Sequence, residues 1–438
     1  MNVRRLLLTA GLIAAAPIAV AQSVILNNPG GGRTFAIRNA TIYPVTSAPI
    51  NGGTLVIENG RIAAVGTNVN VPANATVIDG TGLSVYPGMI DSGTSIGLTE
   101  VSSVAGTRDI QETGDLNPNA KTAVALNPHS NVIPVTRING ITTVLTEPAG
   151  GLISGQSALI QMSGWTPREM VLASPAGMHI NFPAIRTGSS SGQPQDEEAE
   201  KKAKKQYNSQ IDKLRDTFRD AVAYGKALEA AGKNPSSPRP DEDLILRALV
   251  PVVRGEVPLI IHANLAADIR AAIRFSEETG LRMILSGGQE VQQVTSELRA
   301  KNIPVLLGPI WTLPGKEDDP YDMLYANAAA LHQAGVKFSI RTGGAHNARH
   351  LPYQAAASAA FGLPKEEALR AVTINPAEIF GVADRIGSLE TGKIANVIVT
   401  DGDPLEIRTN VVRLFIGGED IPLDSYHTLL YEKFRRRP

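Results

Sequence analysis

The sequence predicts an α/β fold: a (β/α)₈ barrel of the TIM type, plus a small β-sandwich formed by both chain ends. Between residues 87 and 385, strand-like and helix-like runs alternate, which is typical of parallel β–α–β units. This stretch of about 300 residues is long enough for eight such units with insertions. The third observation is that short β-type runs stand at both ends of the chain, and neither set could bury a core alone.

Length and composition exclude several classes of protein. The chain has 438 residues, of which 43% are hydrophobic and 19% charged, so it can bury a large core. With 41 Lys and Arg against 42 Asp and Glu, the formal net charge is −1. This balance argues against a protein that binds nucleic acid or an anionic membrane through its overall charge. Cysteine is absent, which excludes disulfides, zinc–thiolate sites and thiol catalysis.

The first 21 residues predict a secretory signal peptide. Arg4 and Arg5 precede an apolar run over 6–20, and Ala19-Val20-Ala21 supplies the small residues of a cleavage site after Ala21. The alternative is an N-terminal membrane anchor, but the run is shorter than the ~20 residues of a spanning helix. Arg4-Arg5 also suggests twin-arginine export, although its surroundings fit that signal poorly. No other apolar run is long enough to span, so we expect a periplasmic or secreted bacterial protein.

The two β-rich ends, residues 34–86 and 386–420, are expected to pair into one composite module. In the first, Asn59-Gly60 suits a type I′ hairpin turn between the runs 53–57 and 61–66. In the second, the runs 394–399 and 411–416 are rich in Val and Ile. Each set needs the other to bury its inner face.

The central region, residues 87–385, contains seven clear strand candidates and one uncertain one. The third strand falls within 158–162 or 170–173. The alternative architecture is a doubly wound open sheet, but no G-x-G-x-x-G turn follows a strand, which disfavours its dinucleotide-binding form. The clear strand candidates are 85–91, 141–146, 177–182, 257–262, 281–286, 303–308 and 336–341, with helical patterns at 266–279, 290–301 and 321–334.

A charged insertion is predicted at residues 186–240 within the barrel. It contains a long amphipathic helix, because apolar residues recur at steps of three and four. We interpret it as a barrel helix lengthened by a solvated charged turn; the alternative is a partner-binding helix. The apolar stripe consists of Tyr207, Ile211, Leu214, Phe218 and Val222.

Five short motifs follow one another along the chain: Tyr-Pro-Gly-Met-Ile-Asp at 86–91, Asn-Gly-Ile-Thr-Thr-Val at 139–144, Gly-Gln at 155–156, Thr-Ile-Asn-Pro-Ala at 373–377 and the run 387–396. In this order they resemble the amidohydrolase superfamily, specifically its imidazolonepropionase-like exported branch. The resemblance covers residues 34–418. It implies a (β/α)₈ barrel with a β-sandwich built from both chain ends. It also implies metal-dependent hydrolysis of carbon–nitrogen bonds, with one or two divalent ions at the carboxyl ends of the strands.

Compared with the family that the chain resembles, four residues of the metal site are replaced. Gly93 and Ser95 stand where the family carries two histidines after the first strand, and Gly287 stands for the histidine after the sixth. Gly343 stands for the aspartate after the eighth strand, which binds metal and acts as general base. His179 and His262 remain at the ends of the fourth and fifth strands.

This set cannot form a binuclear centre, because glycine offers no side-chain ligand and serine is a poor one. Catalytic zinc usually has three protein ligands, so the two histidines alone lead us to expect no bound metal. The alternative is one Zn²⁺ at His179 and His262 with a third group. Further residues that could face a ligand at the barrel mouth are Asp91, Glu290, Arg341, His346 and His350.

These losses predict a pseudoenzyme, a catalytically impaired homologue that acts as a binding or partner subunit. Its expected partners are further copies of itself, an intact amidohydrolase, or a small-molecule ligand at the barrel mouth. The alternative function is an active hydrolase of amide, peptide or cyclic amide bonds that uses a reduced mononuclear site at His179 and His262. Other catalytic templates are missing, since the chain has neither a G-x-S-x-G elbow nor a G-x-x-x-x-G-K-[ST] phosphate loop.

Overall fold

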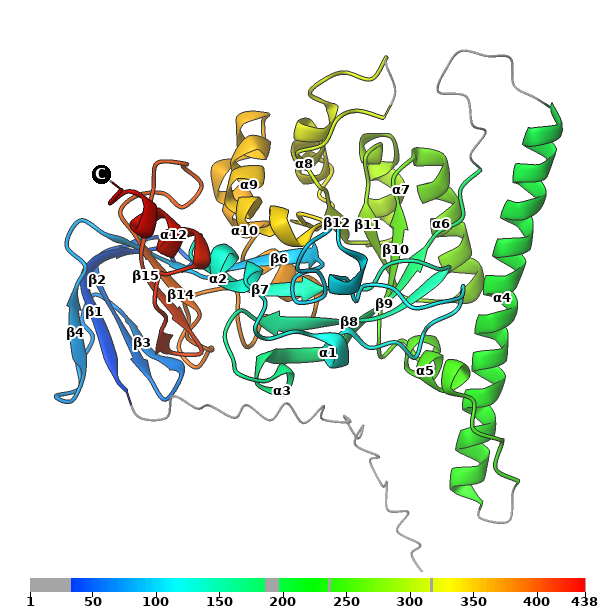
Figure 1. Ribbon diagram of the computed structural model, residues 1–438, viewed down its shortest axis with the longest axis horizontal. Coiled ribbons are helices and arrows are strands. Elements are labelled where there is room, and N and C mark those ends of the chain that lie inside the picture. Colours follow the sequence, from blue (N-terminus) through cyan, green and yellow to red (C-terminus); the bar gives the residue numbers. More distant parts are fainter. Residues whose placement is uncertain (1–32, 186–196, 235–237, 316–317, 438) are drawn as a thin grey trace, which may run out of the picture.

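The computed structural model describes residues 33–185, 197–234, 238–315 and 318–437, so the predicted signal peptide lies outside the described residues. Figure 1 shows two sheets side by side, with the β-rich module at one end and the long helix α4 at the other. The central part of the chain forms the second sheet and the helices around it. The predicted combination of a barrel and a sheet from both chain ends is confirmed.

The end module is one eight-stranded sheet built from both ends of the chain. Its strand order is β16-β15-β14-β5-β1-β2-β3, with β4 also paired to β1. The two ends meet where β14 pairs antiparallel with β5. The strands are β1 (Phe35–Ile42), β2 (Ile50–Glu58), β3 (Arg61–Gly66), β4 (Thr76–Asp79), β5 (Ser84–Pro87), β14 (Val397–Thr400), β15 (Val411–Ile416) and β16 (Glu419–Asp420).

Apolar residues from both ends share the core of this module. Phe35 from β1 and Phe415 from β15 meet edge to face, with ring centroids 5.2 Å apart. Ile37 and Val397 are fully buried in the same cluster. The hairpin between β2 and β3 turns at Asn59 and Gly60, both with positive φ, as the type I′ prediction requires. Burial of these side chains therefore depends on residues about 380 positions apart in the chain being brought together.

The barrel sheet has the order β13-β12-β11-β10-β9-β8-β7-β6. All neighbouring strands are parallel except β8, which is antiparallel to both β7 and β9. The barrel is nearly closed where Gly343 N, after β13, donates to Gly93 O in β6 at 2.9 Å. The strands are β6 (Met89–Thr94), β7 (Ile141–Thr146), β8 (Ile153–Gln161), β9 (Val171–Asn181), β10 (Leu259–Ala263), β11 (Met283–Gly287), β12 (Val305–Leu307) and β13 (Phe338–Ile340).

The antiparallel β8 departs from the regular (β/α)₈ pattern. Of the two candidates for the third strand, 158–162 lies almost wholly in β8, and 170–173 spans the end of α3 and the start of β9. Only residues 147–152 connect β7 to β8. A parallel crossover needs a dozen or more residues, so this short connection forces the next strand to run backwards.

Helices pack around the barrel sheet and join its strands. Among the described residues, none of them is both long and apolar enough to span a bilayer. Their bounds are α1 (Thr122–Ala125), α2 (Val132–Arg137), α3 (Pro167–Met170), α4 (Glu197–Lys233), α5 (Leu244–Val253), α6 (Ala266–Thr279), α7 (Thr295–Ala300), α8 (Met323–Gln333), α9 (Leu351–Ala360), α10 (Lys365–Arg370), α11 (Ile374–Ile379) and α12 (Tyr426–Phe434), with 3₁₀ turns at Ala105–Thr107, Val291–Val294 and Ala345–His350.

The long helix α4 occupies most of the predicted insertion, of which 186–196 and 235–237 lie outside the described residues. The predicted stripe is buried at Ile211, Leu214 and Phe218, whereas Val222 is 39% exposed. Phe218 meets Phe275 of α6 edge to face, with ring centroids 6.1 Å apart. Figure 1 shows α4 running along the end of the barrel and extending past it at both ends.

Candidate functional site

Charged and imidazole side chains converge at the carboxyl ends of the barrel strands, where barrel enzymes place their sites. Glu147 directly follows β7 and Arg341 directly follows β13. His179 lies near the end of β9 and His262 near the end of β10. In the register of these two strands His179 lies opposite Ile260, two residues before His262, so both imidazoles project from the same face. Topology therefore brings residues from four strands together.

The two histidines are in direct contact. Nδ1 of His179 and Nε2 of His262 are 2.9 Å apart, so in this arrangement one ring donates and the other accepts. Burial lowers the pKa of His262 to about 3, and burial together with His262 and Arg341 lowers the pKa of His179 well below its ordinary value. Both imidazoles are therefore neutral at pH 7, the form that binds metal.

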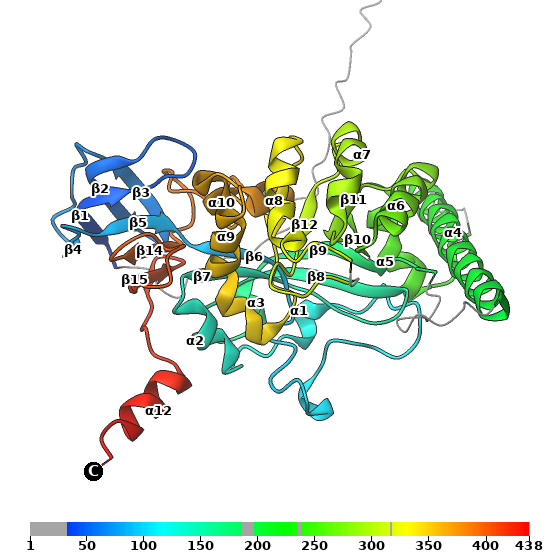
Figure 2. The ribbon, with the colours of Figure 1, turned by 90° about the horizontal axis from the view of Figure 1, so that it is seen from above.

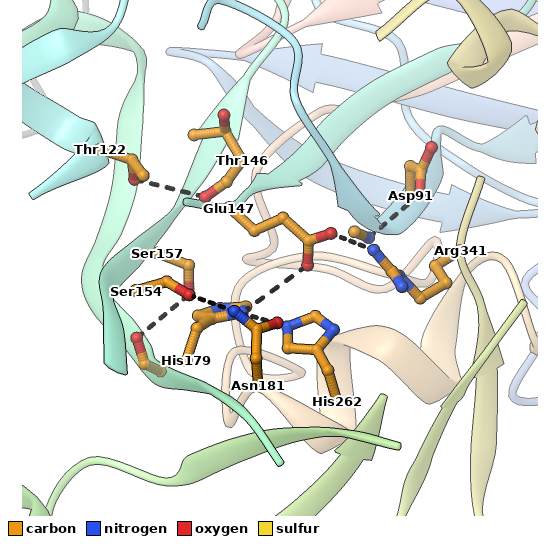
Figure 3. A network of polar contacts seen from close by, with 12 residues as sticks. Asp91, Thr122, Thr146, Glu147, Ser154, Ser157, His179, Asn181, His262 and Arg341 are labelled. Carbon is orange, nitrogen blue, oxygen red and sulfur yellow. Dashed lines mark hydrogen bonds and ion pairs between the residues drawn. The ribbon is translucent and has the colours of Figure 1, made fainter. Parts of the chain in front are cut away.

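Glu147 lies between the histidines and a cation, as Figure 3 shows. Its Oε1 accepts a hydrogen bond from Nη2 of Arg341, and its Oε2 lies 3.8 Å from Nδ1 of His179. The Oε2 atom is buried and has no hydrogen-bond partner. Burial raises the pKa of Glu147 to about 7, against the lowering effect of Arg341. This carboxylate thus has one oxygen committed to Arg341 and one oriented toward the histidines.

Arg341 occupies space beside β6 that a side chain on Gly93 would need. A Cβ on Gly93 would lie 2.5 Å from Nε of Arg341 and 2.9 Å from Oε2 of Glu147. Arg341 is only 8% exposed, and its Nε is buried with no hydrogen-bond partner. Because position 93 is a glycine, the guanidinium of Arg341 can lie in the centre of the barrel.

Asp91 of β6 is held in a fully bonded position at the edge of this centre. Its Oδ1 accepts from the backbone N–H groups of Gly93 and Thr342, each at 3.1 Å, and its Oδ2 accepts from Oγ1 of Thr342. The side chain is completely buried, and this burial raises its pKa to about 6. Asp91 thereby joins β6 to the segment after β13, and neither of its oxygens is left without a donor.

The centre has the donor set for one divalent ion. Glu147, His179 and His262 each offer a ligand atom, and these three atoms lie within 4.8 Å of one another. One carboxylate and two imidazoles match the ligands of zinc and related ions, and three protein ligands are what catalytic zinc usually has. The buried Oε2 of Glu147, which has no hydrogen-bond partner and lies 3.8 Å from Nδ1 of His179, fits the role of a metal ligand. The expectation of no metal counted two ligands, and the structure adds a third.

The described residues do not fit a second ion. Gly287 and Gly343 have φ values of +108° and +78°, which side chains rarely adopt. A Cβ on Gly287 would also lie 2.9 Å from the carbonyl oxygen of Ala263. Ser95 is engaged elsewhere, since its Oγ accepts from the backbone N–H of Ala345 at 3.2 Å. Two of the positions that would hold the second ion, Gly287 and Gly343, are therefore shaped for glycine, and the third, Ser95, bonds to the backbone.

The remaining pocket candidates lie outside this cluster. Glu290 accepts from the backbone N–H of Ala266 at 2.9 Å, a contact at the first residue of α6. His346 is exposed on the 3₁₀ turn after β13. His350 lies beside Trp311, with ring centroids 5.5 Å apart. Of the five candidates, Arg341 contacts the cluster through Glu147, and Asp91 bonds to Thr342, the residue next to Arg341.

Glu147 is the residue that sequence reasoning missed. Its signal was present, because it stands immediately after a clear barrel strand, where a charged side chain points to the site. The resemblance placed metal ligands after the first, fourth, fifth, sixth and eighth strands, so the end of the second was not searched.

Comparison with known proteins connects this geometry to a family. A model of the amidohydrolase family matches residues 319–421. A solved amidohydrolase from Thermotoga maritima is 29% identical, with a TM-score of 0.78, over 89% of this chain and 99% of that one. The chain belongs to the amidohydrolase superfamily.

Two curated amidohydrolase relatives match over very different spans. The amidohydrolase tasK of Hapsidospora irregularis is 24% identical over 445 residues, which is 89% of this chain but 43% of tasK. The D-hydantoinase of Geobacillus stearothermophilus is 39% identical over 83 residues, 19% of this chain and 17% of that enzyme. This chain therefore spans less than half the length of these curated relatives, and the activities in their names belong to those proteins.

The crowding at Gly93 leads to a stability prediction. Gly93→Ala is expected to lower the free energy of unfolding by about 1–3 kcal/mol, because its Cβ overlaps the buried Arg341–Glu147 pair. Chemical denaturation measures this effect. Gly106→Ala is the matched control, since a Cβ there meets nothing within 4 Å, and it should stay within about 0.5 kcal/mol of the parent. Equal effects at both positions would contradict the packing described for Arg341.

Proposed function

We propose that this member of the amidohydrolase superfamily is a catalytically impaired homologue that holds one divalent ion and acts as a binding or partner subunit. This proposal rests on which carboxylate oxygens in the centre already accept hydrogen bonds. Of the four oxygens of Asp91 and Glu147, only Oε2 of Glu147 lacks a hydrogen bond.

A hydrolytic site of this kind needs both a metal ligand and a general base. Oε2 of Glu147 can serve one of these purposes at a time. If it binds the ion, the cluster has no free carboxylate to accept a proton from water, because Gly343 replaces the aspartate that the resemblance assigns to that role. If it acts as base, the ion keeps two protein ligands, fewer than catalytic zinc usually has.

The chain's own residues still suit the binding of a polar ligand. A bound ion would supply Lewis-acid polarisation of a ligand oxygen. Arg341 holds Glu147 through Oε1 and orients Oε2 toward His179, the arrangement by which an outer hydrogen bond fixes a metal-binding carboxylate. Because both imidazoles are neutral, the positive charge comes from the guanidinium of Arg341, which can attract the anionic part of a ligand at the barrel mouth.

A partner role is supported by the length of a relative. Since the match covers 43% of tasK, that protein has more sequence outside the matched part than within it. In tasK a chain like this one is therefore joined covalently to further sequence. We propose that the chain is exported to the periplasm or the exterior and that residues 1–21 are removed. It then associates with itself or with an intact amidohydrolase.

The second candidate function is an active mononuclear hydrolase of amide, peptide or cyclic amide bonds. The specific observation that favours it is the third ligand, Glu147, which completes the minimum set for catalytic zinc. The relatives' names, N-substituted formamide deformylase and D-hydantoinase, denote amide and cyclic amide substrates. In this alternative a group supplied by the substrate or a partner must accept the proton.

A hydrolysis assay of the zinc-loaded chain that starts at Gln22 distinguishes the two candidate functions. We expect the wild type and His262→Asn to release product from N-formyl amines, dipeptides and hydantoins at the same background rate. An intact hydantoinase assayed in parallel shows that the assay detects turnover. Turnover by the wild type that disappears in His262→Asn would overturn the impaired-homologue proposal and establish the mononuclear hydrolase.

A further inference from the structure

The last helix, α12, leaves large apolar side chains uncovered. Tyr426 is 57% exposed, Leu429 60%, Tyr431 66% and Phe434 42%, and none of the nine residues of the helix is buried. Figure 2 shows α12 standing away from both sheets at the end of the chain. The exposure of so many aromatic and aliphatic groups on one short helix indicates that this surface binds a protein or a membrane.

This helix has a defined start and one apolar face. Ser425 caps it, with reciprocal hydrogen bonds between Ser425 and Thr428 that form a capping box. Tyr426, Leu429, Leu430 and Phe434 are spaced by three, one and four residues, so they lie along the same side. The apolar residues therefore form a stripe along one side of the helix, which Lys433, four residues after Leu429, also joins.

A cluster of cations follows the stripe. The five residues 433–437 include four cations: Lys433, Arg435, Arg436 and Arg437. The acidic residue directly before them, Glu432, forms ion pairs with Arg435 and Arg436. Arg437 lies over the ring of Phe434 at 4.3 Å, and Arg435 lies 5.9 Å from the ring centre of Tyr431. The cations thus border the apolar stripe closely.

We propose that α12 and Arg435–Arg437 form a peripheral membrane-binding element that lies in the surface of an anionic phospholipid bilayer. Tyr, Leu and Phe insert at the level of the headgroups and upper acyl chains, while Lys and Arg pair with lipid phosphates. The combination of a basic end with an aromatic and aliphatic face is complementary to such a surface in both charge and polarity.

A membrane explains this face better than a second copy of the chain. The stripe and Tyr431 together expose roughly 500 Å² of side chain, below the about 800 Å² per partner of a standard protein interface. A second copy would also bring two equal clusters of cations together. The overall net charge of −1 does not oppose the proposal, because membrane attraction acts on charges within about a Debye length of the surface.

Vesicle sedimentation with the chain starting at Gln22 tests this proposal. The vesicles are pure phosphatidylcholine, or phosphatidylcholine with 30% phosphatidylglycerol. We expect binding to the anionic vesicles that falls as salt rises, and little binding to the neutral ones. The variant R435Q/R436Q/R437Q should bind the anionic vesicles about a hundredfold more weakly, at roughly fivefold per cation. Leu429→Asp should also weaken binding, because it removes an apolar contact and adds a negative charge that the anionic lipid repels.

The matched control is K202Q/K204Q/K205Q, which removes the same charge from the exposed part of α4 and should bind as the parent does. Absence of binding to the anionic vesicles, or equal binding of R435Q/R436Q/R437Q and the parent to them, overturns the proposal. So does concentration-dependent self-association in sedimentation velocity that Leu429→Asp abolishes, since a second copy would then cover the face. These readouts do not involve the barrel centre, so they are independent of the proposed function.

Discussion

Arg341→Met is expected to lower the free energy of unfolding by about 3–5 kcal/mol, the cost of leaving one member of a buried ion pair without its partner. Glu147 and Arg341 are each only 8% exposed, so water cannot replace the guanidinium. Methionine keeps much of the side-chain volume, which separates the loss of charge from the creation of a cavity. Equilibrium denaturation in guanidinium chloride of the metal-free protein measures the effect.

Two controls identify the cause of that loss. The double variant E147Q/R341M should recover most of the stability, because no uncompensated charge then remains in the interior. Arg219→Met breaks exposed ion pairs with Asp216 and Asp220 and should cost less than about 1 kcal/mol. A small effect of Arg341→Met, or a double variant less stable than Arg341→Met, would show that the pair does not hold the centre together.

Phe415→Ala is expected to cost about 3–5 kcal/mol of stability in the end module. Phe415 is completely buried and contacts Phe35 from the other end of the chain, so its removal leaves a cavity where the two ends meet. The loss should be seen in denaturation and in faster amide hydrogen exchange of β1 and β14.

Phe434→Ala provides the comparison for the same change of residue type. Phe434 is 42% exposed on α12, so its truncation should change stability by no more than about 0.5 kcal/mol. If Phe415→Ala cost as little, or if exchange quickened in β14 but not in β1, the two ends would be independent and the composite module would be wrong.

The fold was largely predictable because its signals are local. The parallel strands from β9 to β13 appear as apolar runs separated by helical patterns, and the Asn59-Gly60 turn is a direct consequence of residue type. The direction of β8 was not predictable from its own residues, which are buried throughout and show no alternation. It depends on the length of the connection after β7, and hence on where both strands end.

The centre was predictable only in part, because it is assembled from distant strands. His179 and His262 were predicted from the resemblance, which places ligands at these strand ends. Asp91 and Arg341 were named as facing the barrel mouth, but the ion pair between Arg341 and Glu147 joins residues 194 positions apart, and no spacing in the sequence encodes it. Gly93 was interpreted as a replaced ligand position, and the structure adds that the guanidinium of Arg341 fills the space a side chain there would need.

Zinc content after metal loading measures whether Glu147, His179 and His262 hold an ion. The chain starting at Gln22 is equilibrated with zinc, passed through zinc-free buffer and analysed by elemental mass spectrometry. We expect about one zinc per chain, lost in both Glu147→Gln and His262→Asn and retained in His350→Asn, a histidine outside the cluster. Two zinc ions per chain, none, or one that persists in Glu147→Gln and His262→Asn would contradict a single centre held by Glu147, His179 and His262.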